Sequence, residues 1–164
     1  MKKISFRNDV LPLKNALYRL ALRITLNREE AEDIVQDTLI KVWNKRESWD
    51  EIDSIEAFSL TICKNLALDH LKRSSRQDSQ IGGAAEEKPD GSSSPYEQML
   101  HKDRMTLIRR LVDALPEKQR CCMQLRDFEG KPYKEIAEIM EISEEQVKVN
   151  IFRARQAIKQ RFKQ

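Results

Sequence analysis

Long apolar runs are missing from this sequence of 164 residues, and so are the features of a signal peptide. A membrane-spanning helix needs about 18 to 20 consecutive apolar residues, and no segment approaches that length. The N-terminal stretch MKKISFRNDV lacks the apolar centre of a signal peptide. We therefore expect no membrane insertion and a cytoplasmic location.

Cysteine, histidine and glycine are also scarce. The 3 cysteines include the adjacent pair Cys121 and Cys122, and their odd number and spacing favour buried, reduced packing residues over a disulfide framework or a zinc site. His70 and His101 lie far apart with no catalytic motif around them, and no Gly-rich loop could cradle a phosphate. The sequence predicts a protein that is not an enzyme, with no metal, no cofactor and no small-molecule substrate.

The few glycines and prolines are unevenly distributed. Three of the 4 glycines and two of the 5 prolines fall in SSRQDSQIGGAAEEKPDGSSSP, residues 74–95. This segment has few apolar side chains that could offset the entropy of ordering it, so it is predicted to be a flexible linker. Residues 1–73 and 96–164 are then two small domains. A linker of this kind permits both a compact arrangement of the domains and an extended one.

Charged residues are abundant, at 35% of the chain, and they combine with Leu and Gln into patterns of helical period. The first domain is predicted to contain helices over residues 11–26, 28–45 and 54–73. Asn27, followed three residues later by Glu30, is typical of the start of the second helix. The sequence therefore predicts an all-α fold.

The predicted second helix contains AEDIVQDTLIKVW, an acidic stretch in a chain whose net charge is +3. One face carries an apolar stripe that we expect in the core: Ala31, Ile34, Val35, Thr38, Leu39 and Val42. The opposite face carries Asp33, Gln36, Asp37 and Asn44 around Ile40. Carboxylates around an apolar side chain suit a basic partner that also offers an apolar contact. An ordinary solvated face is the alternative.

The second domain is predicted to contain a helix over 96–114, a segment from Pro116 to Gly130, and helices over 133–140 and 144–162. A short turn between the last two, with Ser143 as N-cap, resembles a helix-turn-helix. The side chains that we expect the two helices to bury are Ile136, Ala137, Met140, Val147, Ile151, Ala154, Ile158 and Phe162.

The last helix is strongly basic, because residues 146–164 include six Lys or Arg side chains and no acidic one. Opposite its core stripe lie Glu145, Val149, Phe152, Arg153 and Gln156. Arg can read guanine edges in a major groove while apolar side chains contact thymine methyl groups. The pattern favours duplex DNA recognition over a merely solvated basic helix.

Taken together, the two halves resemble a sigma factor of the extracytoplasmic-function (ECF) group of the sigma-70 family, a promoter-recognition subunit of bacterial RNA polymerase. AEDIVQDTLIKVW resembles region 2.2 of that family and TICKNLALDHLKR resembles region 2.4. LPEKQR and PYKEIAEIMEISEEQVKVNIFRARQAI resemble region 4. The resemblance covers nearly the whole chain outside the linker and the extreme termini.

This resemblance implies partners and site residues. Region 2.2 docks on the β′ clamp helices of core polymerase, region 2.4 reads the −10 element as unpaired bases, and region 4 binds the −35 duplex and the β flap. The residues implied for core polymerase are Asp33, Gln36, Asp37 and Ile40. Those implied for the −10 element are Trp49, Lys64, Asn65, Lys72 and Arg73, together with the loop 49–56. Those implied for the −35 element are Tyr133, Lys134, Lys148, Val149, Asn150, Phe152, Arg153 and Arg155.

Other interpretations stay open at this point. Trp49 could belong to the core, and Asn65 could cap or bridge helices. The loop 49–56 is acidic, which is unusual beside DNA, and Glu141 stands where the family commonly has Gly; a positive φ there would cost about 1 kcal/mol. Family habit implies an anti-sigma partner. A stand-alone helix-turn-helix regulator of duplex operators explains the C-terminal half equally well, but not the acidic face around Ile40.

Overall fold

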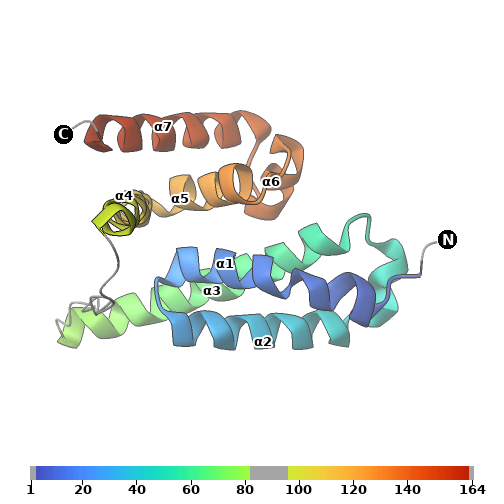
Figure 1. Cartoon of the computed structure of the whole chain (residues 1–164). Helices are drawn as coiled ribbons and strands as arrows, with labels where there is room; N and C mark the ends of the chain where they lie inside the picture. Colours follow the sequence, from blue (N-terminus) through green and yellow to red (C-terminus); the bar gives the residue numbers. More distant parts are fainter. Residues whose placement is uncertain (1–2, 82–95, 163–164) are drawn as a thin grey trace.

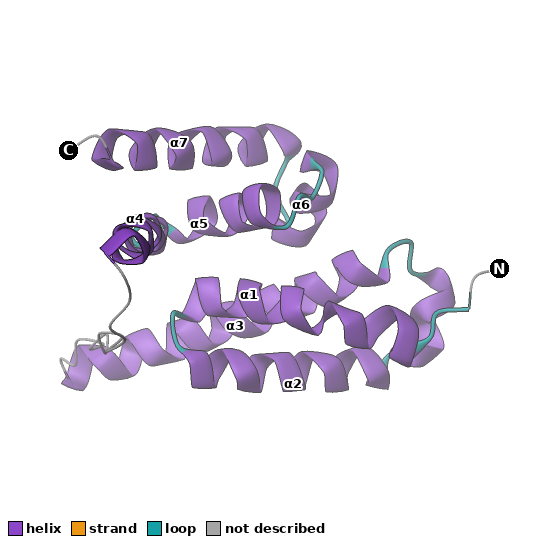
Figure 2. Cartoon of the chain, in the orientation of Figure 1, coloured by secondary structure: helices purple, strands orange, loops and turns teal. Residues whose placement is uncertain are grey.

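The computed structural model describes residues 3–81 and 96–162, and every regular element in these two ranges is helical (Figure 1; Figure 2). Seven α-helices are joined by short π and 3-10 turns. The elements in chain order are η1 (Phe6–Val10), η2 (Leu11–Leu13), α1 (Lys14–Thr25), α2 (Arg28–Asn44), η3 (Arg46–Glu51), α3 (Ile55–Ile81), α4 (Tyr96–Asp113), α5 (Glu117–Met123), η4 (Gln124–Phe128), α6 (Tyr133–Met140) and α7 (Glu144–Phe162).

The N-terminal half packs α1, α2 and α3 around an apolar core that contains the predicted stripe of α2. The Asn27 side chain accepts a hydrogen bond from the Glu30 N–H at 3.0 Å, which confirms the predicted N-cap. A second cluster forms where Val10, Val42 and Trp49 meet. Helix α3 differs from its predicted end, because it continues through residues 74–81 of the predicted linker. Residues 82–95 lie outside the described residues.

The C-terminal half begins with α4, which packs against α7 (Figure 1). Gly130 ends the α5–η4 segment with φ +71, a conformation that favours glycine. At the start of α7, the Ser143 Oγ accepts from the Gln146 N–H at 3.1 Å, and Gln146 Oε1 accepts from the Ser143 N–H at 3.0 Å. This reciprocal capping box separates α6 from α7 as the sequence predicts.

Most of the expected core of α6 and α7 is buried, including Ile136, Met140, Val147, Ile151 and Ala154. Ala137 and Ile158 are half-buried. The expectation for Phe162 is wrong: it is exposed. Phe162 is the last residue of α7.

The two halves do not stand apart. One apolar core includes Leu17 and Cys63 from the N-terminal half and Cys121, Ile136 and Ile151 from the C-terminal half. In Figure 1 the C-terminal helices lie over α1 and α3, while α2 lies on the far side. Of the two arrangements that the sequence permits, the structure shows the compact one.

Candidate polymerase and DNA interfaces

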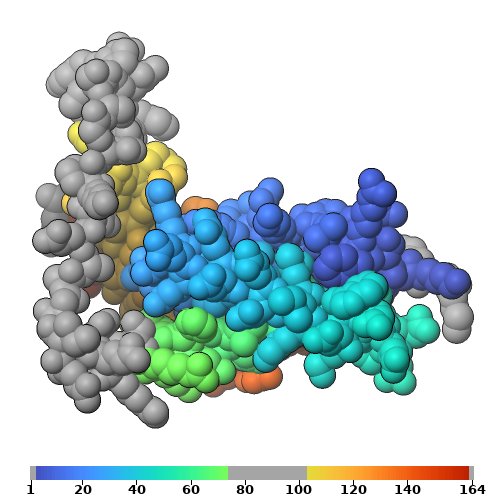
Figure 3. Space-filling model, turned by 90° about the horizontal axis from the view of Figure 1, so that it is seen from below, coloured from blue at the N-terminus to red at the C-terminus, as the bar shows by residue number. Residues whose placement is uncertain are grey.

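The outer face of α2 is open to solvent. Asp33, Gln36, Asp37 and Ile40 are all exposed, and Ile40 is 56% exposed. Figure 3 shows the underside of the molecule, which is formed mainly by the N-terminal half. The structure therefore brings together, on one helix face, the four residues predicted for a polymerase contact.

Trp43 extends this face, and the sequence analysis did not select it. Its side chain is 45% exposed, with the Arg46 guanidinium 4.5 Å above the ring centroid and the Phe6 ring edge-on at 5.3 Å. Gln36, Ile40 and Trp43 follow the i, i+4, i+7 spacing of one helix face, which was the available signal. Exposed aromatic side chains are enriched at protein interfaces.

Trp49 and Lys64 are not at the surface, although both were predicted to contact the −10 element. Trp49 is 7% exposed, and its indole N–H donates to the Val42 carbonyl at 3.1 Å. This position corresponds to the packing alternative. Lys64 is only 3% exposed. Its ammonium lies 3.9 Å from a carboxylate oxygen of Glu141, in the turn between α6 and α7.

The other three −10 candidates, Asn65, Lys72 and Arg73, are exposed along α3. Within the acidic loop before α3, Asp50, Glu51 and Asp53 are also exposed. Glu56 differs, because its carboxylate forms an ion pair with Lys131 of the C-terminal half. Part of the acidity of this loop therefore serves the contact between the halves.

The outer face of α7 carries the predicted base-reading residues. Val149 and Arg153 are exposed, and Phe152 is 62% exposed. A shallow surface depression at the N-terminal end of the helix is lined in part by Gln146, Val149 and Arg153. Two exposed apolar side chains beside a cation are unusual on a merely solvated helix, and this combination suits contacts in a major groove.

Other residues predicted for the −35 element surround this face. Tyr133 has the Arg126 guanidinium 4.5 Å and the Lys148 ammonium 5.8 Å from its ring centroid. Arg155 is held by both carboxylate oxygens of Asp127, and this hydrogen bonding raises the pKa of the guanidinium. Lys134 is exposed.

Asn150 is half-buried, and its side-chain amide donates to the Gln146 carbonyl at 2.8 Å, within its own helix. Its amide oxygen stays available as an acceptor. The orientation of the Asn150 side chain is therefore held by its own helix.

Several other expectations can be compared with the described residues. Cys63, Cys121 and Cys122 are free and buried, as expected of packing residues. Among the side chains that the structure describes, no three or more of His, Cys, Asp or Glu form a cluster that could hold a metal ion. Among the helices of those ranges, none is long and apolar enough to span a bilayer.

Two family models match separate parts of the chain. A model of sigma-70 region 2 matches residues 10–77, and a model of sigma-70 region 4 matches residues 105–158. The chain belongs to the sigma-70 family. Its function as a sigma factor is to recognise promoters for RNA polymerase, which the fold and both regions support.

Individual relatives cover most of this sigma factor. The RNA polymerase sigma-H factor of Pseudomonas aeruginosa is 29% identical over 164 residues, which cover 95% of this chain and 85% of the relative. The ECF RNA polymerase sigma-E factor of Salmonella typhimurium is 29% identical over 141 residues, 79% of this chain and 72% of the relative. The sigma factor RpoE of Bartonella quintana, solved in complex with the anti-sigma factor NepR, superposes with a TM-score of 0.77 over 96% of both chains at 25% identity.

Proposed function

We propose that this sigma factor docks on the β′ clamp helices of core RNA polymerase through the outer face of α2. In this proposal, residues 1–73 bind polymerase and read the −10 element, residues 74–95 form a linker, and residues 96–164 read the −35 element and contact the β flap. The chain acts by binding and not as an enzyme, and it works in the cytoplasm.

The observation that carries the docking proposal is the composition of the exposed α2 face. Ile40 points directly away from the buried stripe, with Asp33 and Asp37 beside it and Trp43 one turn further on. Carboxylates at the rim and apolar side chains at the centre are the arrangement of a protein interface. A basic, partly apolar helical partner such as a clamp coiled coil fits this surface.

The DNA contacts are proposed on the two basic helices. On α7, Arg153 and Lys148 read base edges, and Val149 and Phe152 contact thymine methyl groups. Tyr133, Lys134, Asn150 and Arg155 contact the backbone, which adds affinity that weakens as salt rises. On α3, Asn65, Lys72 and Arg73 contact the unpaired −10 strand. Trp49 stabilises this site through its packing. Lys64 contributes only when its ammonium group is exposed.

An anti-sigma factor is a further proposed partner. The support is the solved relative, a sigma factor bound to an anti-sigma factor, which resembles this chain over 96% of its length. Such a partner would compete for one or more of the exposed surfaces described above.

The docking proposal is tested with the variants Ile40→Lys and Asp37→Lys, measured for binding to purified core polymerase. Each places a cation where a basic partner is expected, so each should abolish measurable binding while leaving helix content and thermal unfolding unchanged. Leu11→Lys is the matched control, because Leu11 is also an exposed aliphatic side chain of the N-terminal half. Wild-type affinity in both α2 variants would exclude this face from the interface.

A further inference from the structure

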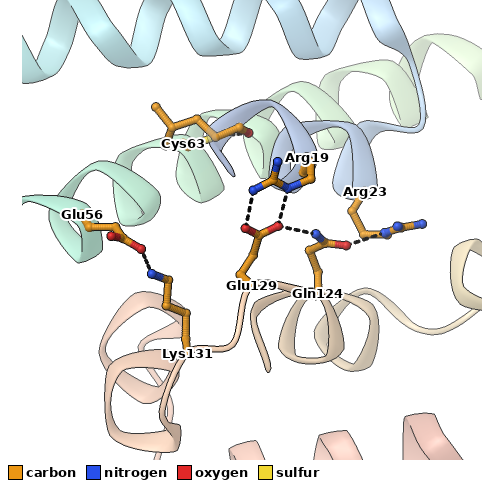
Figure 4. A network of polar contacts seen from close by, with 8 residues as sticks. Arg19, Arg23, Glu56, Cys63, Gln124, Glu129 and Lys131 are labelled. Carbon is orange, nitrogen blue, oxygen red and sulfur yellow. Dashed lines mark hydrogen bonds and ion pairs between the residues drawn. The ribbon is translucent and has the colours of Figure 1, made fainter. Parts of the chain in front are cut away.

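The segment between α5 and α6 presents two neighbouring carboxylates to two different helices. Glu129 faces α1, where the Arg19 guanidinium donates to both of its oxygens at 2.7 Å (Figure 4). Asp127 faces α7 instead, where it accepts two hydrogen bonds from the Arg155 guanidinium, one of them from Nε at 3.1 Å. The first pair joins the two halves of the chain. The second lies within the C-terminal half, beside the proposed DNA face.

Asp127 lies on a turn whose backbone is closed by hydrogen bonds. The Gly130 N–H donates to the Arg126 carbonyl at 3.1 Å. The Lys131 N–H donates to the Leu125 carbonyl at 2.9 Å, and Leu125 itself is fully buried. The Arg126 side chain adds a hydrogen bond to the Lys131 carbonyl at 2.9 Å. The backbone that carries the Asp127 carboxylate is therefore fixed against the core.

Arg155 has donors left for a second partner. A guanidinium carries five N–H donors in a planar fork, and Asp127 takes one from Nε and one from Nη2. The Arg155 side chain is 52% exposed, so the remaining donors can reach an anion outside the protein. The pKa of the guanidinium is raised, chiefly by the hydrogen bonding to Asp127 and further by Tyr133. Arg155 therefore stays a cation while one of its edges is held.

Two further cations lie close to the same place, on either side of the Tyr133 ring. The Arg126 guanidinium is 4.5 Å and the Lys148 ammonium 5.8 Å from the ring centroid. Tyr133 begins α6, Lys148 belongs to α7, and Arg126 precedes Asp127 in η4. A carboxylate in such a basic cluster weakens the attraction for DNA phosphates. A need for charge therefore does not explain Asp127.

We propose that Asp127 is a positioning residue for −35 recognition: it fixes the Arg155 guanidinium so that the free edge contacts one backbone phosphate in a single geometry. This role rests on the proposed function, because it concerns the same α7 surface. Phosphate contacts set the register and orientation of a protein on a duplex, whereas base contacts read the sequence. A side chain that is already ordered loses less freedom when it binds. Asp127 therefore improves discrimination between sequences, although its charge opposes DNA binding.

The orientation matters because the base-reading side chains lie on the same helix. Val149 and Arg153 are exposed on α7 and line one shallow depression. A freely rotating Arg155 would find a phosphate at any register of α7 on the duplex. When Asp127 holds it, Arg155 meets its phosphate only with Val149 and Arg153 at the base edges. The pair thus makes a sequence-independent contact contribute to selection.

The experiment measures transcription by core polymerase with the full-length chain, on a promoter library in which the −35 block is randomised. The −35 preference is the ratio of initiation from the best block to the average of the pool. Asp127→Asn removes the charge and keeps the size of the side chain, so the preference should fall roughly two- to tenfold. The chain alone should bind a random-sequence duplex as tightly as the wild type does, or up to about twofold more tightly.

A second variant tests the pair from its other side. Arg155→Lys keeps the positive charge but cannot form the bidentate contact, so the −35 preference should fall by a similar factor. The double variant should lose no more preference than either single variant, because both changes remove the same contact. Asp103→Asn is the matched control, since it makes the same change at an exposed position on α4 and should leave the preference unchanged.

Unchanged preference in Asp127→Asn, with stronger initiation from every block, would overturn the positioning role and show that Asp127 only repels DNA. Additive losses in the double variant would overturn it too, as would an equal loss at all blocks together with a lower melting temperature. No initiation with the wild-type chain would refute the proposed function together with this role. Initiation without any −35 preference would refute the −35 contacts and this role, and would leave the polymerase contact standing.

Discussion

Helices α3 and α7 are the two basic helices proposed to face DNA, and the structure exposes them differently. The base-reading face of α7 is open, with Phe152 at 62% exposure, whereas Lys64 of α3 is at 3%. Helix α7 buries one narrow stripe, while α3 packs against α1 and α2 on one side and α6 on another. Charge and helical period alone therefore do not determine whether a basic side chain is available to DNA.

The largest expected effect concerns the open helix. Arg153→Ala and Phe152→Ala should each lower promoter-specific initiation by roughly five- to 150-fold, because a specific base contact is worth about 1–3 kcal/mol. Arg161→Ala is the matched control, since Arg161 is an exposed cation near the end of the same helix. It should weaken binding to all sequences slightly, without a change in preference. Equal losses for Arg153 and Arg161 would mean that α7 contributes charge but no readout.

The next prediction tests whether the halves form one cooperative unit. Burial raises the pKa of Cys63 and of Cys121 to about 12, from an ordinary value of 9.0. Above pH 9 the unfolded chain loses these protons and the folded chain keeps them. Stability therefore falls as pH rises from 9 to 12, by up to about 1.4 kcal/mol per pH unit for each thiol.

The measurement is urea unfolding between pH 8 and pH 10, on the wild type and on Cys121→Ala. In Cys121→Ala the free energy of unfolding should depend less steeply on pH, by the contribution of one thiol. All probes should report the same single transition. Two separate transitions, with the slope changed in only one of them, would show that the halves unfold independently.

A smaller effect is expected from the Arg19–Glu129 pair. A double-mutant cycle with Arg19→Ala and Glu129→Ala should give a coupling of about 0.5–1 kcal/mol, because Arg19 is largely exposed and solvent screens its charge. The coupling should decrease between 0.1 and 1 M salt. A coupling near zero at low salt would mean that this ion pair does not help to hold the halves together.

The smallest effect separates backbone strain from the contact with α3. Leu26 and Glu141 both end helices with positive φ, at 59 and 58. Leu26→Gly should stabilise the fold by about 0.5–1 kcal/mol, and Glu141→Gly should stabilise it less, because it also removes the carboxylate that faces the buried Lys64. Only Glu141→Gly should also speed the reaction of iodoacetamide with the Cys121 thiol, because Leu26 does not face Lys64. Faster labelling of Cys121 in both variants would show that the changed backbone, and not the loss of the Glu141 carboxylate, makes the thiol accessible.

Much of the fold follows from local sequence signals. The Asn27 and Ser143 caps, the apolar stripe of α2 and the α6–α7 turn are all present as predicted. Each depends on contacts within a few residues, which explains why a single sequence suffices. The end of α3 was missed because polar residues after Arg73 are compatible with either a linker or a solvated helix.

The contact between the halves could not be predicted, because it depends on pairs distant in sequence. Arg19 and Glu129 are individually ordinary charged residues, and nothing near either of them indicates the other. The burial of Lys64 has the same cause, since a lysine on a basic helix is normally exposed. Trp49 is covered for a similar reason, because it packs with Val10 and Val42 in the second cluster.

The most direct test of the central claim is start-site mapping of transcripts made by purified core polymerase on a promoter library, with and without this chain. New start sites that share a −10 and a −35 block are expected only when the chain is present, and they should be lost with Ile40→Lys. No gained start site, together with tight binding of the chain alone to a palindromic duplex, would contradict the account and favour a stand-alone regulator.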